Sequence, residues 1–197
     1  ILYLTLSLGF LGMILSRDLF NLFVFLEIAS ISTAILIGLN LDQRSISAGF
    51  KYLIAGGLIS AFMLIGIIYI YKDTGTLSLD LLNAVGSTGF SQAGLIALFL
   101  LFAAVLIELK PFPANGWALD VYQTASPGLA AIISTASSGA VLFILYKLLP
   151  LASPGIIQFI IISGIVTFVS SNLIGLKQTD ARRLLGYSSI AQLGLLS

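Results

Sequence analysis

Glu27 is the residue whose type and position point most directly to chemistry. It lies near the middle of a long apolar stretch, in the sequence Phe-Val-Phe-Leu-Glu-Ile. A charged side chain at the centre of a bilayer costs at least about 2.5 kcal/mol, so it persists where it faces a bundle interior, pairs with another group or relays ions. The position therefore predicts a proton relay. A structural polar group, hydrogen-bonded between helices, is the alternative.

A second group of chemical interest surrounds two prolines. Glu108 and Lys110 come directly before Pro111 and Pro113, and the residues as far as Trp117 remain largely apolar. Each proline removes an amide donor and interrupts the α-helical hydrogen-bond ladder. A helix broken inside the membrane beside an acid–base pair is typical of transporter ion sites, where freed backbone groups line a cavity. The alternative is that the chain leaves the membrane at Lys110-Pro111 and begins a loop.

Asp120 and Lys147 complete the set of proton-relay candidates. Asp120 lies beyond Trp117, and Lys147 ends another apolar stretch in Leu-Tyr-Lys-Leu-Leu-Pro. A lysine at such an end often anchors a helix at the membrane interface, because its ammonium group snorkels to water. That anchoring role is the alternative for Lys147.

The composition excludes most other chemistry. Of 197 residues, 58% are hydrophobic and only 9% are charged, with a mean hydropathy of +1.11. A soluble domain carries roughly 25% charged residues, so this chain cannot coat a water-facing surface. It contains no Cys and no His, which removes thiol chemistry, disulfides, the usual zinc sites and His-based catalysis. A net charge of +1 without a basic run offers no electrostatic footprint for nucleic acid.

Seven apolar stretches must position these residues, and most approach the roughly 20 residues that a helix needs to cross a bilayer. They predict one all-α polytopic membrane domain, and the one long connection, Lys72–Phe90, contains Gly86. The stretches are Ile1–Leu15, Leu19–Leu39, Phe50–Tyr71, Ser91–Leu109, Pro127–Leu149, Gly155–Leu176 and Leu184–Ser197. The first has no basic segment before it and the last is too short to cross, so we expect a fragment of a longer protein.

Thr179-Asp180 predicts a helix start, with basic residues shortly after it.

Charges between the stretches predict the orientation. Connections after the first, third and fifth stretches hold three positive charges, and those after the second, fourth and sixth hold six. The positive-inside rule places the second set in the cytoplasm or its equivalent. The two sets are Arg17, Lys72 and Lys147, and Arg44, Lys51, Lys110, Lys177, Arg182 and Arg183.

Four segments together resemble the antiporter-like membrane subunits of respiratory complex I, membrane-bound hydrogenases and Mrp-type cation/proton antiporters. Asp18–Ile28 resembles the fifth transmembrane helix of that family with its buried Glu, and Phe50–Leu53 resembles the opening of the sixth. Phe112–Pro127 is similar to the stretch after the broken seventh helix, and Thr179–Ile190 to the start of the tenth. The family fold has two inverted five-helix repeats, so the resemblance implies a single antiporter-like domain over residues 1–197, running from helix four to helix ten.

The chain departs from the family pattern at the expected basic residues. The key Lys of the family's seventh helix lies nine residues before the Trp, where this chain has Glu108. A second family Lys, in the eighth helix, falls at Ser138, and the usual His falls at Asn115. Lys110 takes over the role of the first Lys, or Glu108 replaces it with a carboxylate.

The resemblance implies a proton-translocating membrane subunit of a redox-driven NADH:quinone oxidoreductase or membrane-bound hydrogenase. A subunit of a secondary Mrp-type cation/proton antiporter, or a non-pumping relative, is the alternative. We expect no cofactor in this chain, with Fe–S clusters, flavin or Ni–Fe in partner subunits of a redox complex. We expect the lipid bilayer and other membrane subunits as partners, in the prokaryotic cytoplasmic membrane or, as the alternative, the mitochondrial inner membrane.

Overall fold

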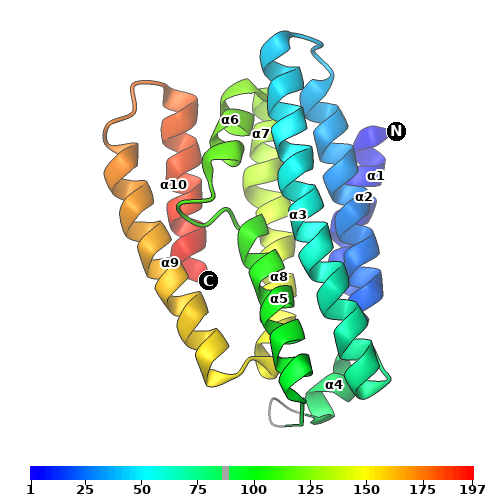
Figure 1. Cartoon of the computed structure of the whole chain (residues 1–197). Helices are drawn as coiled ribbons and strands as arrows, with labels where there is room; N and C mark the ends of the chain where they lie inside the picture. Colours follow the sequence, from blue (N-terminus) through cyan, green and yellow to red (C-terminus); the bar gives the residue numbers. More distant parts are fainter. Residues whose placement is uncertain (86–88) are drawn as a thin grey trace.

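The computed structural model describes residues 1–85 and 89–197, so Gly86 of the long connection lies outside it. The described residues form helices joined by short connections (Figure 1). The all-helical prediction is therefore confirmed. In chain order the helices are α1 (Leu2–Leu15), α2 (Leu19–Gly38), α3 (Gln43–Thr74), α4 (Leu79–Val85), α5 (Gln92–Glu108), α6 (Gly116–Thr124), α7 (Pro127–Ile132), η1 (Ile133–Ser137), α8 (Ser138–Leu148), η2 (Leu149–Leu151), α9 (Pro154–Gly175) and α10 (Ala181–Leu196).

Short polar side chains determine where most of these helices begin. The carboxylates of Asp18, Asp42 and Asp180 accept hydrogen bonds from amides in the first turns of α2, α3 and α10. The hydroxyls of three serines do the same for α5, α7 and α9: Ser91, Ser126 and Ser153. Each cap satisfies an amide that has no partner within its own helix. The helix start predicted at Asp180 is confirmed.

Four of the described helical segments are long and apolar enough to cross a membrane. They are α2, α3, the continuous segment Pro127–Leu151 and α9, whereas α1 and α5 are apolar but shorter. The predicted stretches match helices closely, except that α3 begins at Gln43 rather than Phe50. The helix begins earlier because Asp42 caps it within a polar segment that precedes the apolar stretch. The number of seven spans stays a prediction.

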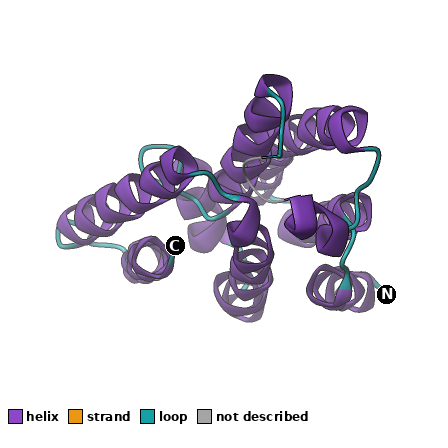
Figure 2. Ribbon diagram, turned by 90° about the horizontal axis from the view of Figure 1, so that it is seen from below, coloured by secondary structure: helices purple, strands orange, loops and turns teal. Residues whose placement is uncertain are grey.

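The helices pack as a bundle with a more separate C-terminal pair. α1 packs on α2, α2 on α3, and α3 on α5, while α9 and α10 pack on each other and α6 contacts both α3 and α10. Figure 2, turned by 90° from Figure 1, shows the two chain ends on opposite sides of the molecule. A Cβ added at Gly164 of α9 would lie 2.6 Å from the carbonyl oxygen of Gly194 of α10. Glycine is therefore required where these two backbones meet.

Apolar side chains cover the outside of the bundle as well as its core. On α9, Ile161, Ile162 and Ile165 expose more than half of their surface, while Ile160 is buried. Exposed aliphatic side chains along whole helices would be unfavourable in water and are favourable against lipid tails. The exterior therefore fits the membrane environment expected from the composition.

Two irregularities lie in the middle of the bundle. α5 ends at Glu108 and α6 begins at Gly116, and the connection between them crosses the bundle interior at mid-height rather than at an end (Figure 1). Beside it, the long helix from Pro127 contains the π-helical turn η1. Such turns frequently occur at functional sites.

Candidate functional site

The break between α5 and α6 is built around Lys110. Its backbone φ of 62° lies in the left-handed region, a conformation that costs a residue with a side chain about 1–2 kcal/mol. Pro111 then lacks the amide that a continuing helix would need. The next amide, that of Phe112, donates to Thr167 Oγ1 of α9 at 3.0 Å. Backbone groups at the break are thus satisfied by a neighbouring helix.

The ammonium group of Lys110 points into the bundle. The side chain is 1% exposed, and its Nζ donates to Ser138 Oγ at 3.2 Å. Ser138 in turn donates to the carbonyl oxygen of Ile133, five residues earlier, at 3.1 Å. The hydroxyl of Ser138 therefore donates to a backbone carbonyl of the π-helical turn while its oxygen accepts from the lysine ammonium group. The buried Lys110 thus links the break after α5 to the start of α8.

Glu108 is the buried acid beside this lysine. Its side chain is 6% exposed, and both Lys110 and Glu27 lie close enough to influence it electrostatically. A buried charge is tolerated where an opposite charge lies nearby, so the two residues together lower the cost that each would pay alone. Glu108 and Lys110 are therefore both buried at the end of a broken helix, with one residue between them in the sequence.

Glu27 lies across the bundle on α2. Its side chain is half-buried, and its carboxylate accepts a hydrogen bond from Ser60 Oγ of α3. Tyr52, also on α3, is buried and lies within electrostatic range of Glu108. The hydrogen bond between Glu27 and Ser60 thus joins α2 to α3, and the relay role of Glu27 stays a prediction.

Asp120 lies on α6, which packs on α3 and α10 in the upper part of the bundle in Figure 1. Its carboxylate lies 2.5 Å from Lys51 Nζ of α3 and 3.8 Å from a guanidinium nitrogen of Arg183 of α10. The neighbouring Gln123 donates to Asp180 at 3.0 Å and accepts from Arg183 at 3.2 Å. The upper ends of α3, α6 and α10 are thereby joined by polar contacts.

Lys147 does not join the other relay candidates. Its Nζ donates to three backbone carbonyls at the C-terminal end of α1, with the one of Met13 at 3.1 Å and the others at Ile14 and Ser16. A cation at this position interacts favourably with the negative end of the helix dipole. The ammonium also lies 5.2 Å from the ring centroid of Phe143. Lys147 therefore caps the C-terminal end of α1.

Lys110 also corrects the charge count used for orientation. The sequence count assigned it to a connection outside the membrane, whereas its side chain is fully buried in the bundle. The remaining basic residues of that set number five, against three in the other set, so the predicted orientation keeps its sign.

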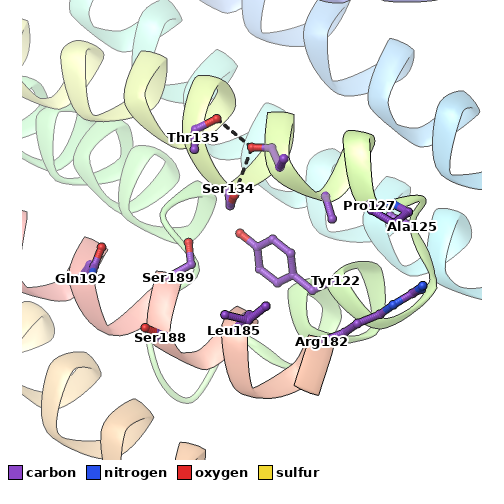
Figure 3. A pocket seen from close by; sticks show the side chains of 13 residues that line it. Tyr122, Ala125, Pro127, Ser134, Thr135, Arg182, Leu185, Ser188, Ser189 and Gln192 are labelled. Atoms are coloured by element: carbon purple, nitrogen blue, oxygen red, sulfur yellow. Dashed lines mark hydrogen bonds between the residues drawn. The ribbon is translucent and has the colours of Figure 1, made fainter. Parts of the chain in front are cut away.

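Two cavities lie near the upper end. One, of about 620 Å³, is polar and lies between α3, α6 and α10. The other, of about 470 Å³, is largely apolar and lies between α7, η1 and α10. In the second, the Tyr122 ring projects toward Ser134 and Ser189 (Figure 3), and its buried hydroxyl lacks a hydrogen-bond partner among the described residues. No group of three or more acidic residues in the described part of the chain could hold a metal ion.

The partners that hold the charged residues could not be identified from the sequence. Ser60, Thr167 and the pairing of Lys51 with Asp120 received no role, and Ser138 was noted only as a missing lysine. A buried hydroxyl in a transmembrane helix is a weak signal by itself, because serine and threonine also occur where helices merely pack closely. Their importance becomes visible only when the tertiary structure shows which charge each one meets.

A family model described as the transmembrane part of NADH:quinone oxidoreductase and Mrp antiporter subunits matches residues 16–197. The NADH-quinone oxidoreductase subunit N of Rubrobacter xylanophilus is 32% identical over 200 residues, covering 99% of this chain and 42% of that protein. The subunit N of Desulforudis audaxviator is 35% identical over 205 residues, covering 99% of this chain and 40% of that protein. The chain therefore spans about two fifths of the relatives that it matches.

The fold agrees with two solved respiratory complexes. A chain of the archaeal membrane-bound sulfane sulfur reductase superposes with a TM-score of 0.89 and 36% identity, covering 98% of this chain and 41% of that one. A chain of respiratory complex I from Thermus thermophilus does so with a TM-score of 0.85 and 30% identity, covering 98% and 42%. Sequence and structure agree along nearly the whole length. The chain belongs to the NADH:quinone oxidoreductase/Mrp antiporter transmembrane family.

Proposed function

We propose that this chain is the ion-translocating part of a membrane subunit in a respiratory redox complex, and that the ion is a proton. The observation that carries the proposal is the set of ionisable groups placed within the bundle. Glu108 and Lys110 are buried at the broken helix, Lys110 donates to Ser138, and Glu27 accepts a hydrogen bond from Ser60. Ionisable groups at such positions in a membrane bundle are typical of proton relays.

Glu108 and Lys110 have different tasks in this proposal. Glu108 binds and releases the proton, since a carboxyl group can be neutral or charged in the bundle interior. Lys110 supplies the fixed positive charge that favours the ionised form of that carboxyl group. Because Lys110 reaches Ser138 at the start of α8, its ammonium group places a positive charge beside the position where the family has a second lysine.

The whole subunit lies beyond what this chain covers. We propose that residues 1–197 correspond to helices four to ten of an antiporter-like subunit, with the other membrane subunits of the complex as partners. Electrons would pass through Fe–S clusters, flavin or Ni–Fe in those partners, and electrostatic or conformational coupling would move the proton here. The prokaryotic cytoplasmic membrane is the proposed location, in line with the bacterial and archaeal relatives.

Glu27→Gln tests the relay in the assembled complex. The amide keeps the shape of the side chain and a hydrogen-bonding partner for Ser60, but it cannot bind and release a proton. We expect electron transfer to continue while substrate-driven proton uptake into vesicles, followed with a pH-sensitive dye, is lost. Glu108→Gln should be more damaging to proton uptake than Lys147→Ala, because Lys147 hydrogen-bonds to backbone carbonyls at the end of α1 and to none of the other relay candidates. Undiminished proton uptake per electron in Glu27→Gln would remove Glu27 from the relay.

A further inference from the structure

Charged and polar residues line the polar cavity at the upper end of the bundle. The cavity is lined by the start of α3 and the C-terminal half of α6, including Ser47, Lys51, Asp120 and Gln123. Lys51, Asp120 and Arg183 form the upper ion cluster, in which Asp120 contacts one cation from α3 and one from α10. The side chain of Asp120 is 29% exposed, and those of Lys51 and Arg183 are 52% and 33% exposed. Two members of the cluster, Lys51 and Asp120, therefore line the cavity, and all three are partly exposed.

Below the upper ion cluster lies an aromatic pair. Tyr52, next to Lys51 on α3, meets Trp117 of α6 edge to face, with ring centroids 5.4 Å apart. Trp117 is three residues before Asp120 and thus lies on the same side of α6. Tyr52 is only 4% exposed, whereas Lys51 and Asp120 are partly exposed, so the aromatic pair reaches deeper than the ion cluster. Glu108 is buried as well, at 6% exposed.

Buried polar atoms without partners surround the same route. Among the described residues, Asn115 Nδ2 and Trp117 Nε1 at the start of α6 and Arg183 Nε of α10 are buried and make no hydrogen bond. An unsatisfied buried polar atom costs about 1–3 kcal/mol, so native structures contain few of them. All three are N–H donors around one short helix, and each needs an acceptor such as the oxygen of a water molecule, so the start of α6 suits ordered water.

α6 is a short helix whose position depends on its neighbours. It has nine residues, follows a break of seven residues after α5, and is tied to α3 and α10 by the contacts of Asp120 and Gln123. We propose that the upper ion cluster is a gate that seats α6 against α3 and α10 and thereby closes the polar cavity from the buried Glu108. The gate rests on the proposed function, because it takes Glu108 as the destination of the proton. Asp120 is a positioning residue in this gate, because it acts by holding α6 against α3 and α10.

Cysteine labelling in the assembled complex tests the gate without measuring transport. The 197 residues contain no cysteine, so an introduced one can be identified on its own peptide by mass spectrometry. Asn115→Cys reports on the buried start of α6, and Ser47→Cys reports on the cavity wall. Both variants are treated with a charged, membrane-impermeant thiol reagent. With the ion cluster intact, we expect Ser47→Cys to react and Asn115→Cys to be protected.

Adding Asp120→Asn should raise the labelling rate of Asn115→Cys by up to about fivefold, as expected when a partly exposed ion pair is lost. Lys51→Gln removes the same contact from the other helix and should act in the same direction, should Asp120→Asn fail to assemble. Asp120→Glu keeps the charge and should keep Asn115→Cys protected. Asp80→Asn, which breaks the Arg17–Asp80 ion pair at the other end, is the matched control and should change nothing.

Two results would overturn the gate. One is an unchanged labelling rate of Asn115→Cys in both Asp120→Asn and Lys51→Gln while Ser47→Cys reacts normally. The other is equal labelling of Asn115→Cys and Ser47→Cys with the cluster intact. Neither depends on proton movement, so a failed gate leaves the relay standing. Conversely, a failed Glu27→Gln test would leave any result of the labelling in place.

Discussion

At the residue scale, Lys110 and Lys147 both end helical segments, but their ammonium groups meet different partners. Lys110 donates to the side chain of Ser138 in the bundle interior, next to the acid Glu108. Lys147 donates to three backbone carbonyls of α1. The sequence could not separate these two cases, because the partner of each lysine comes from a segment remote in the chain.

The contacts of Lys147 predict a structural effect of its loss. Lys147→Met keeps the length of the side chain and removes the cation from the end of α1. We expect it to destabilise the docking of α1 on α8 by about 2 kcal/mol, the upper range for a charge at a helix terminus. The measurement is the midpoint of thermal unfolding in detergent, with the exposed Tyr146→Phe as control.

Proton uptake per electron in Lys147→Met should remain close to that of the unaltered complex. A normal unfolding midpoint combined with lost proton uptake would instead return Lys147 to the relay.

At the element scale, the start of α10 depends on the carboxylate of Asp180. It accepts the amides of Arg182 at 2.8 Å and Arg183 at 3.2 Å, as well as the side chain of Gln123. These backbone hydrogen bonds, above all that of Arg183, lower the pKa of Asp180 below its usual range. This carboxylate both caps α10 and ties it to α6.

A lowered pKa in the folded state gives a defined pH dependence. The ionised Asp180 contributes stability above the pKa it has in the unfolded chain, about 4, and this contribution is lost as the pH falls through the lower, folded value. Asp180→Asn still accepts the capping hydrogen bonds but carries no charge. The unaltered protein should therefore lose more thermal stability than Asp180→Asn between about pH 5 and pH 2. Parallel stability curves of the two proteins over this range would contradict the assignment.

The elements were predictable from sequence to different degrees. Apolar length located the long helices, and Asp180 marked the start of α10, because both signals are local. The seven-residue α4 and the nine-residue α6 gave no such signal, since short helices depend on tertiary packing. For the break, the two prolines left two interpretations open. The positive φ of Lys110 and the contact of Phe112 with Thr167 follow from packing and could not be read from the prolines alone.

At the scale of the whole molecule, the partners decide between a redox complex and a secondary antiporter. Purification of the assembled protein in mild detergent, with mass spectrometry of co-purifying subunits and spectra of iron and flavin, addresses this directly. We expect Fe–S subunits together with flavin or nickel subunits. A colourless assembly of small membrane proteins would favour the antiporter alternative and would contradict the redox complex.

The π-helical turn η1 also fixes the rotational phase of the helix in which it lies. Ala130 and Ala131 before the turn line the apolar cavity, while Ser138 and Lys147 after it reach α5 and α1. Successive residues of an α-helix are about 100° apart around its axis, so deleting one residue from η1 would rotate one set of contacts away from its partners. This segment should therefore tolerate many substitutions at its lipid-facing positions but no change in its length.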